Sequence, residues 1–105
     1  MTSLPGKKLG ILVSTKPSSP GFNHAIRIAA AALEQQVVVY LYCIDDAVVG
    51  AGDSRLQELK SHGLKLYACA YGAQQRGLPL GDEATFAGLT VVSDILAGTD
   101  RFLAF

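Results

Sequence analysis

The sequence predicts an α/β fold with a largely parallel sheet of about five strands. Three apolar runs, at residues 9–14, 37–44 and 64–69, have the length of buried strands, and the stretches between them have helical spacing. The run at 37–44 does not alternate apolar with polar residues, which is typical of a strand covered on both faces. Strands that alternate with helices form parallel sheets through helical crossovers. We expect one domain over residues 1–105.

The first strand, residues 9–14, leads through a loop to a helix over residues 22–35. Apolar residues recur through this segment at intervals of three and four positions, as they do on one face of a helix. Ser19 is placed to cap this helix, and Pro20 suits its first turn.

The second strand is followed by a polar and glycine-rich segment, residues 45–52. A second helix is expected to begin at Asp53 or Ser54 and to run to His62. Gly63 follows as its C-terminal stop.

The rest of the chain follows the third strand. Residues 70–75 suit a helical turn that ends at Arg76 and Gly77. Beyond a connector, Asp82 is expected to cap a short turn through residue 87. The final elements are then a helix over residues 90–97 and a strand over residues 101–105.

Charge and composition restrict the classes of function. Nine basic residues balance nine acidic ones, which argues against a nucleic-acid-binding surface or an electrostatically held membrane protein. Charged residues make up 17% of the chain, against about 25% in typical soluble domains. We therefore expect further copies of the chain to cover part of the surface, in a homo-oligomer.

The compartment is expected to be the cytoplasm. No apolar stretch approaches the roughly 20 residues that span a bilayer, and the apolar run after Lys7 and Lys8 is too short for a signal peptide. The two cysteines, Cys43 and Cys69, are then expected as free thiols. No CxxC, HxH or HExxH spacing occurs, so we expect neither a metal nor another cofactor.

Cys69 is the strongest candidate for a reactive residue. It stands where the third strand ends and a helical turn begins, so free backbone N–H groups and the positive end of the helix dipole favour its thiolate. The alternative is a small buried side chain of the core, as most free cysteines are. Cys43 lies inside the most hydrophobic strand and is expected in the core, with a resolving thiol near Cys69 as its alternative.

Other polar residues are expected at the same edge of the sheet as Cys69. The carboxyl ends of parallel strands meet at one edge, where ligands bind in open α/β folds. Asp45 and Asp46 follow the second strand there, either as an acid–base pair or as turn residues. His24 is expected near this edge and is a candidate to tune Cys69, whereas His62 is expected at the opposite edge.

The loop after the first strand is a weaker candidate site. The hydroxyl groups of Ser14, Thr15, Ser18 and Ser19 precede a helix N-terminus, an arrangement that holds phosphate groups in flavin-binding proteins of this architecture. The loop lacks a compact glycine pattern and contains two prolines, which favours an ordinary turn. Flavin or nucleotide binding at this loop stays open as an alternative function.

The spacing around Cys69 extends to a family pattern. Cys69 ends the third strand, and Arg76 and Gly77 follow seven and eight residues later. After the second strand comes Asp-Ala-Val at positions 46–48. In these features the chain resembles the DsrE/DsrF-like sulfur-relay family, in particular its TusD/DsrE branch. After the second strand, the family commonly has Asp-Gly-Val where this chain has Asp-Ala-Val. The resemblance extends from the first strand to the C-terminal RFLAF.

The resemblance implies a flavodoxin-like three-layer α/β/α domain that assembles as a homotrimer or homohexamer. It also implies that Cys69 accepts sulfane sulfur as a persulfide and passes it to a partner, which is a sulfurtransferase activity. The implied partners are a sulfur donor and a sulfur acceptor, rhodanese-like or TusA-like. Arg76 is a candidate to hold the persulfide anion or an acidic partner surface, or else it caps its helix. Since relatives without the cysteine are accessory subunits, a non-catalytic assembly module is the alternative.

Overall fold

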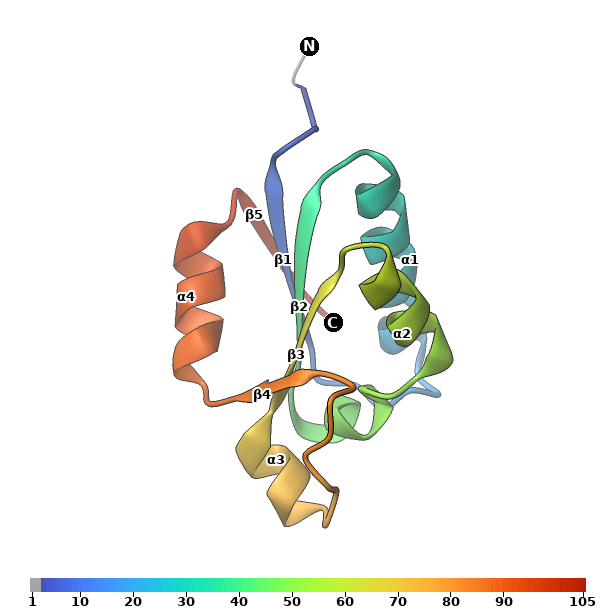
Figure 1. Ribbon diagram of the computed structural model, residues 1–105, viewed down its shortest axis with the longest axis vertical. Coiled ribbons are helices and arrows are strands. Elements are labelled where there is room, and N and C mark those ends of the chain that lie inside the picture. The colour runs from blue at the N-terminus through green and yellow to red at the C-terminus, as the bar shows by residue number, and fades with distance from the viewer. Residues whose placement is uncertain (1–2) are drawn as a thin grey trace.

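In the computed structural model, residues 3–105 form a five-stranded parallel sheet with helices on both faces (Figure 1). The elements, in chain order, are β1 (Lys8–Val13), α1 (Pro20–Glu34), β2 (Val38–Cys43), the 3₁₀ helix η1 (Asp45–Gly50), α2 (Ser54–Ser61), β3 (Lys65–Cys69), α3 (Ala70–Gln75), β4 (Thr85–Ala87), α4 (Thr90–Gly98) and β5 (Arg101–Ala104). Residues 1 and 2 of the expected domain lie outside the described residues.

The strand order is β4-β3-β2-β1-β5, and every neighbouring pair is parallel. Figure 1 shows the sheet edge-on, with α1 and α2 on one side and α4 on the other, while α3 lies beyond the carboxyl ends of the strands. The predicted three-layer α/β/α fold with a parallel sheet is therefore confirmed. The carboxyl ends of β1, β2 and β3 share one edge, because crossovers through helices keep these strands parallel.

Two apolar clusters fill the space on either side of the sheet. Toward α1 and α2 the cluster includes Leu41 and Cys43, and toward α4 it includes Tyr42 and Cys69. Side chains of successive strand residues point to opposite faces, and both faces of β2 are buried at its carboxyl end. This explains why the run at residues 37–44 is apolar without alternation.

The helix α4 packs closely against the sheet because β1 carries a glycine. A Cβ atom built on Gly10 would lie 2.7 Å from Ile95 Cγ2 and 2.8 Å from Phe102 Cδ2. No side chain fits there without a shift of α4 or β5. Gly10 therefore sets the distance between the sheet and the α4 layer.

The helices α1 and α2 begin as the sequence predicts. Ser19 is the N-cap of α1, with Pro20 as its first residue, and Ser19 Oγ accepts the N–H of Phe22 at 3.4 Å. Asp53 is the N-cap of α2, where its carboxylate accepts the Arg55 N–H at 2.8 Å. Hydrogen bonds from Arg55 lower the pKa of the Asp53 carboxyl, so this cap is ionised at neutral pH.

The segment after α3 differs from its prediction. Residues 82–87 were expected to form a short turn capped by Asp82, but Thr85–Ala87 is the edge strand β4, which pairs with β3 in the register Cys69↔Ala87. Asp82 instead presents its backbone carbonyl to the ammonium of Lys60. The three residues of β4 gain their hydrogen bonds from β3, a partner distant in sequence, and so carry no local strand pattern.

The segment after β2 also has more structure than its composition indicates. Residues 45–50 form the 3₁₀ helix η1, in which Asp45 has a φ of 53°. This helix turns the chain back toward the sheet and buries Ala47 and Val48. Over residues 3–105, no helix is both long enough and apolar enough to cross a lipid bilayer.

Candidate functional site

Cys69 lies at the junction between β3 and α3. It is the last residue of β3 and the N-cap of α3, and its Sγ accepts a hydrogen bond from the Gly72 N–H at 3.4 Å. Only 5% of the residue is exposed. The local sequence explains the position: small residues allow a tight helix to start directly after the strand, and Gly77, with a φ of 67°, follows its end.

Tyr42 of β2 is a second component of the site. Its ring packs in the same cluster as Cys69, and its hydroxyl donates a hydrogen bond to the carbonyl of Ala87 at 2.9 Å. Burial is the main cause of a raised Tyr42 pKa, and the adjacent Cys69 thiol raises this pKa further. The phenol therefore remains protonated at neutral pH and ties the end of β4 to β2.

Sequence reasoning did not single out Tyr42. Side-chain alternation in the second strand does place it on the face opposite to Cys43. Whether Tyr42 lies next to Cys69 also depends on the register Tyr42↔Tyr67 between β2 and β3. The sequence alone does not determine this register. The hydrogen bond to Ala87 depends in turn on the unpredicted strand β4.

Arg76, the C-cap of α3, folds back over that helix. Its Nη1 donates to the carbonyl of Gly72 at 3.2 Å, and its Nη2 donates to Asp46 Oδ1 at 3.2 Å. A Cβ atom built on Gly72 would lie 3.6 Å from both Arg76 Nη1 and Cys69 Cβ. The Arg76 guanidinium and the Cys69 side chain therefore both lie next to Gly72.

Asp46 and Val48 connect η1 to the site. Asp46 is 69% exposed, so its ion pair with Arg76 contributes little stability, and its effect is to orient the guanidinium. Val48 is buried in the cluster of Cys69, and its Cγ2 would lie 3.3 Å from a Cβ on Gly72. The run at 46–48 therefore supplies one side chain that orients Arg76 and another that covers Cys69.

Cys43 and Cys69 are both free thiols, but they belong to different clusters. Cys43 packs in the cluster toward α1 and α2, whereas Cys69 packs on the opposite face of the sheet. Burial raises the pKa of the Cys43 thiol to about 12. Cys43 is therefore a protonated residue of the core, the position expected from its place in the most hydrophobic strand.

The predicted residue His24 lies away from Cys69. His24 is exposed on α1, and α1 packs on the opposite face of the sheet from the Cys69 cluster. No hydrogen bond or ion pair joins the two residues within the described chain. His62 is the C-cap of α2 and contacts Glu58 at 3.1 Å.

The hydroxyl-rich loop follows β1, and β2 separates it from β3 in the sheet. Ser14 Oγ donates to the carbonyl of Phe105 at 3.3 Å, and Ser19 Oγ donates to the carbonyl of Lys16 at 2.8 Å while it caps α1. Ser18 is exposed. Thr15 Oγ1 is buried and has no hydrogen-bond partner in the described structure. Two of the four hydroxyl groups therefore hold the protein's own backbone.

Residues 3–105 contain no group of three His, Cys, Asp or Glu side chains that is arranged to hold a metal ion. On the face of the sheet toward α4, this edge offers the Cys69 thiol with the Gly72 N–H on its sulfur. Tyr42 packs in the same cluster, and the Arg76 guanidinium lies next to Gly72.

Comparison with known proteins identifies the family. The family model of the DsrE/DsrF-like family matches residues 7–105. The chain belongs to the DsrE/DsrF-like family. The crystal structure of the YchN protein from E. coli is similar to this fold, with a TM-score of 0.78 and 22% sequence identity over 95% of this chain and 99% of that one. No curated protein matches the chain significantly.

The predicted family is confirmed, and family membership points to sulfur relay in general. The structural similarity supports the predicted fold, because parallel α/β domains of this shape are shared by both proteins. Assignment to the TusD/DsrE branch stays a prediction.

Proposed function

We propose that this DsrE/DsrF-like protein carries sulfur on Cys69, as a persulfide that it receives from one protein and passes to another. The observation that carries the proposal is the position of Cys69 at the N-cap of α3, with the Gly72 N–H on its sulfur. The Arg76 guanidinium lies next to the same glycine. Hydrogen-bond donors and a cation stabilise an anionic sulfur, which is the nucleophilic form.

The chemistry needs two exchange steps at sulfur. In the first, the Cys69 thiolate attacks the terminal sulfur of a donor persulfide, forms a new S–S bond and releases the donor as a thiolate. In the second, an acceptor thiolate attacks the terminal sulfur on Cys69 and restores the Cys69 thiolate. Sulfur moves without net oxidation or reduction, so neither step needs a cofactor.

The surrounding residues have separate roles in this scheme. The Gly72 N–H and the start of α3 stabilise the sulfur anion. Arg76, oriented by Asp46 and bonded to the Gly72 carbonyl, would supply positive charge on the same helix as the persulfide. Tyr42 keeps its proton and holds β4 in place beside Cys69 through Ala87, so its hydrogen bond controls how easily a partner reaches the sulfur.

Access to Cys69 requires movement of the residues packed around it, because the residue is 5% exposed. The edge strand β4 is the part best suited to move, since it has three residues and pairs with β3 directly beside Cys69. A terminal persulfide sulfur also extends one atom beyond the thiol. Binding of a partner at this edge would open β4 and expose the sulfur for attack.

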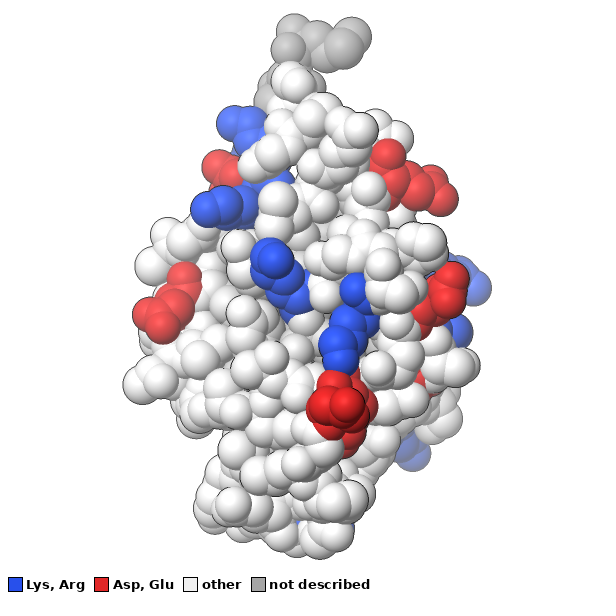
Figure 2. Space-filling model, in the orientation of Figure 1, with Lys and Arg blue, Asp and Glu red and all other residues white. Residues whose placement is uncertain are grey.

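The surface near Cys69 suits a protein partner. Tyr71 of α3 is 66% exposed and Val49 of η1 is 52% exposed. In Figure 2 the end of the molecule formed by α3 is almost free of charged side chains in this view. Exposed aromatic and aliphatic side chains with few charges are typical of the centre of a protein interface. We place the donor and the acceptor, rhodanese-like or TusA-like, at this surface.

Two further features complete the proposal. The protein works as a homotrimer or homohexamer, in agreement with its small share of charged residues, 17% of the chain. It works in the cytoplasm, where free thiols such as Cys43 and Cys69 remain reduced.

Mass spectrometry after incubation with a persulfide donor tests the proposal. The expected product is one added sulfur atom, mapped to the peptide that contains Cys69 and lost on treatment with a reducing thiol. The Cys69→Ser variant should gain none, and Cys43→Ser should gain as much as the wild type. An unmodified Cys69, or sulfur uptake that persists in Cys69→Ser, would refute the assignment.

Burial of Cys69 favours a second candidate, a non-catalytic assembly module of the same family. In that function the thiol is a core side chain and its cover does not open. Thiol labelling of the native protein at neutral pH separates the two candidates. Labelling of Cys69 much faster than global unfolding supports sulfur transfer, whereas labelling only at the rate of unfolding supports the assembly module.

A further inference from the structure

A pocket of about 350 Å³ lies at the amino edge of the sheet, the edge opposite to Cys69. It is bounded by the turn before β1, the first residues of β1 and β5, and the start of β2. Its apolar floor includes Leu4, Leu9 and Val37, and its charged rim includes Lys7, Asp100 and Arg101. Pockets of this size with an apolar floor and few polar groups are typical of small-molecule sites.

Backbone hydrogen bonds hold the walls of this pocket in place. Gly6 N–H donates to the carbonyl of Gln36 at 3.0 Å, and Val38 N–H donates to the carbonyl of Lys7 at 2.8 Å. On the other wall, Asp100 N–H donates to the carbonyl of Lys8 at 2.8 Å. A site with such walls is already formed before a ligand arrives, which lowers the entropic cost of binding.

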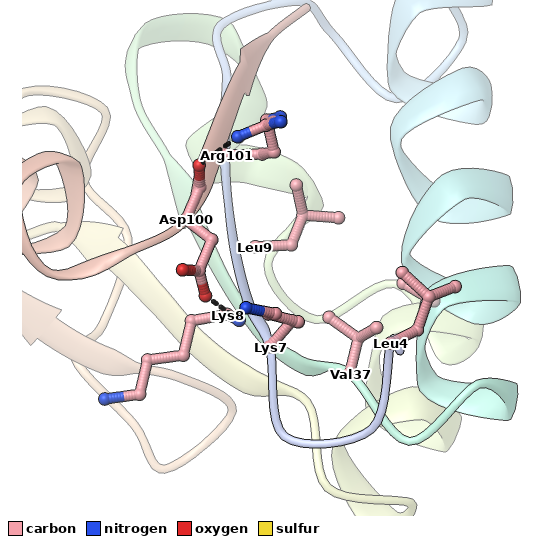
Figure 3. A pocket seen from close by; sticks show the side chains of 8 residues that line it. Leu4, Lys7, Lys8, Leu9, Val37, Asp100 and Arg101 are labelled. Atoms are coloured by element: carbon pink, nitrogen blue, oxygen red, sulfur yellow. Dashed lines mark hydrogen bonds between the residues drawn. The ribbon is translucent and has the colours of Figure 1, made fainter. Parts of the chain in front are cut away.

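The pocket remains open because β5 is the edge strand of the sheet. Leu103, two residues after Arg101, is 38% exposed. The register Leu9↔Arg101 places the side chains of Leu9 and Arg101 on the same face of the sheet. Figure 3 shows Leu4, Leu9 and Val37 between β1 and the helix α1, while the Lys8 side chain points away from them.

The rim is positively charged. Lys7 and Arg101 form no ion pair with another described residue, and the one carboxylate of the rim, Asp100, accepts the backbone N–H of Lys8 at 2.8 Å. Arg101 Nη1 donates to the carbonyl of Asp100 at 2.9 Å, which directs the guanidinium toward the rim. Figure 2 shows basic side chains gathered over the amino ends of β1 and β5. An anionic group would complement these cations.

The geometry points to a second binding site, at which this pocket takes a small monoanion with an apolar chain, its head on Lys7 and Arg101 and its chain on Leu4, Leu9 and Val37. A guanidinium pairs with carboxylate and phosphate heads through two parallel hydrogen bonds. A volume of about 350 Å³ holds roughly ten groups of the size of a water molecule. A carboxylate with a chain of about eight carbons matches this volume.

Octanoate tests the proposal by isothermal titration calorimetry on the wild-type protein. We expect saturable binding with a Kd on the order of 0.1–1 mM, as the atom count of the ligand allows. Acetate has the head alone and 1-octanol has the chain alone, so each should bind at least about tenfold more weakly. Equal binding of octanoate and 1-octanol, or no saturable binding of octanoate, would overturn the proposal.

Variants locate the site. The double variant Lys7→Gln/Arg101→Gln should weaken octanoate binding about ten- to thirtyfold. The fold should persist, because both side chains are exposed. Lys65→Gln, an exposed lysine outside the pocket, is the matched control and should bind as the wild type does. An unchanged Kd in the double variant would refute the site. Cys69→Ser should bind octanoate normally, which keeps this test independent of the proposed sulfur transfer.

Discussion

Removal of the Tyr42 hydroxyl tests how the site is covered. Tyr42→Phe keeps a ring that is 1% exposed and deletes the 2.9 Å hydrogen bond to the carbonyl of Ala87. Loss of this bond at a buried position should lower the free energy of unfolding by about 1–2 kcal/mol. For a chain of this length, that change corresponds to a decrease of about 5–10 °C in Tm. Urea unfolding followed by circular dichroism measures it.

The same substitution should make Cys69 more reactive. Since the hydrogen bond ties Ala87 of β4 to β2, and Ala87 pairs with Cys69, its loss should favour opening of β4. A shift of 1–2 kcal/mol changes the open population about five- to thirtyfold, and labelling of Cys69 by a disulfide reagent should accelerate by the same factor.

Tyr40→Phe is the matched control for both measurements. Tyr40 occupies the same strand and cluster as Tyr42, and its hydroxyl makes no hydrogen bond with the described residues. It should change the free energy of unfolding by less than about 0.5 kcal/mol and leave labelling unchanged. If Tyr42→Phe is destabilised but labels as slowly as Tyr40→Phe, β4 is not the cover of Cys69.

Gly10→Ala should destabilise the protein by about 1–3 kcal/mol in urea unfolding, because the added Cβ would overlap side chains of α4 and β5. A Cβ on Gly52 would have nothing within 4 Å, so Gly52→Ala should cause no such loss of stability. Equal effects of the two substitutions would contradict this packing. Because the pKa of Asp53 is lowered in the folded protein, its charge stabilises the fold at pH values above the ordinary carboxyl pKa. This stabilisation is lost as the pH falls through the folded-state pKa of Asp53. The stability difference between wild type and Asp53→Asn should therefore shrink at acidic pH, and a constant difference would argue against the charge effect. Burial that raises the Cys43 pKa to about 12 should keep Cys43 unlabelled at pH 8 in the native protein, so that Cys69→Ser shows no native labelling.

The sequence predicts those parts of the fold that depend on local patterns. The run around β2, the Ser19 cap and the stop at Gly77 follow from apolar spacing and backbone preferences, which act between near neighbours. The strand β4 was missed because its three residues are held by β3 rather than by their own pattern.

The same distinction applies to the site. Cys69 and Arg76 were predicted because one short helix fixes both, and their spacing is visible in the chain. Tyr42 and Val48 were not predicted as site residues, since they reach Cys69 only through the strand register and the turn of η1. The pairing of Asp46 with Arg76 joins two segments 30 residues apart, which no local pattern determines.

The central claim is that sulfur passes through Cys69, and one mass-spectrometric measurement follows it directly. The protein is loaded from a persulfide donor, separated from that donor, and mixed with a TusA-like acceptor thiol protein. The account predicts one added sulfur on the Cys69 peptide, which disappears as one sulfur appears on the acceptor, with no transfer by Cys69→Ser. Sulfur that never occupies Cys69, or that reaches the acceptor equally well with Cys69→Ser, would contradict it.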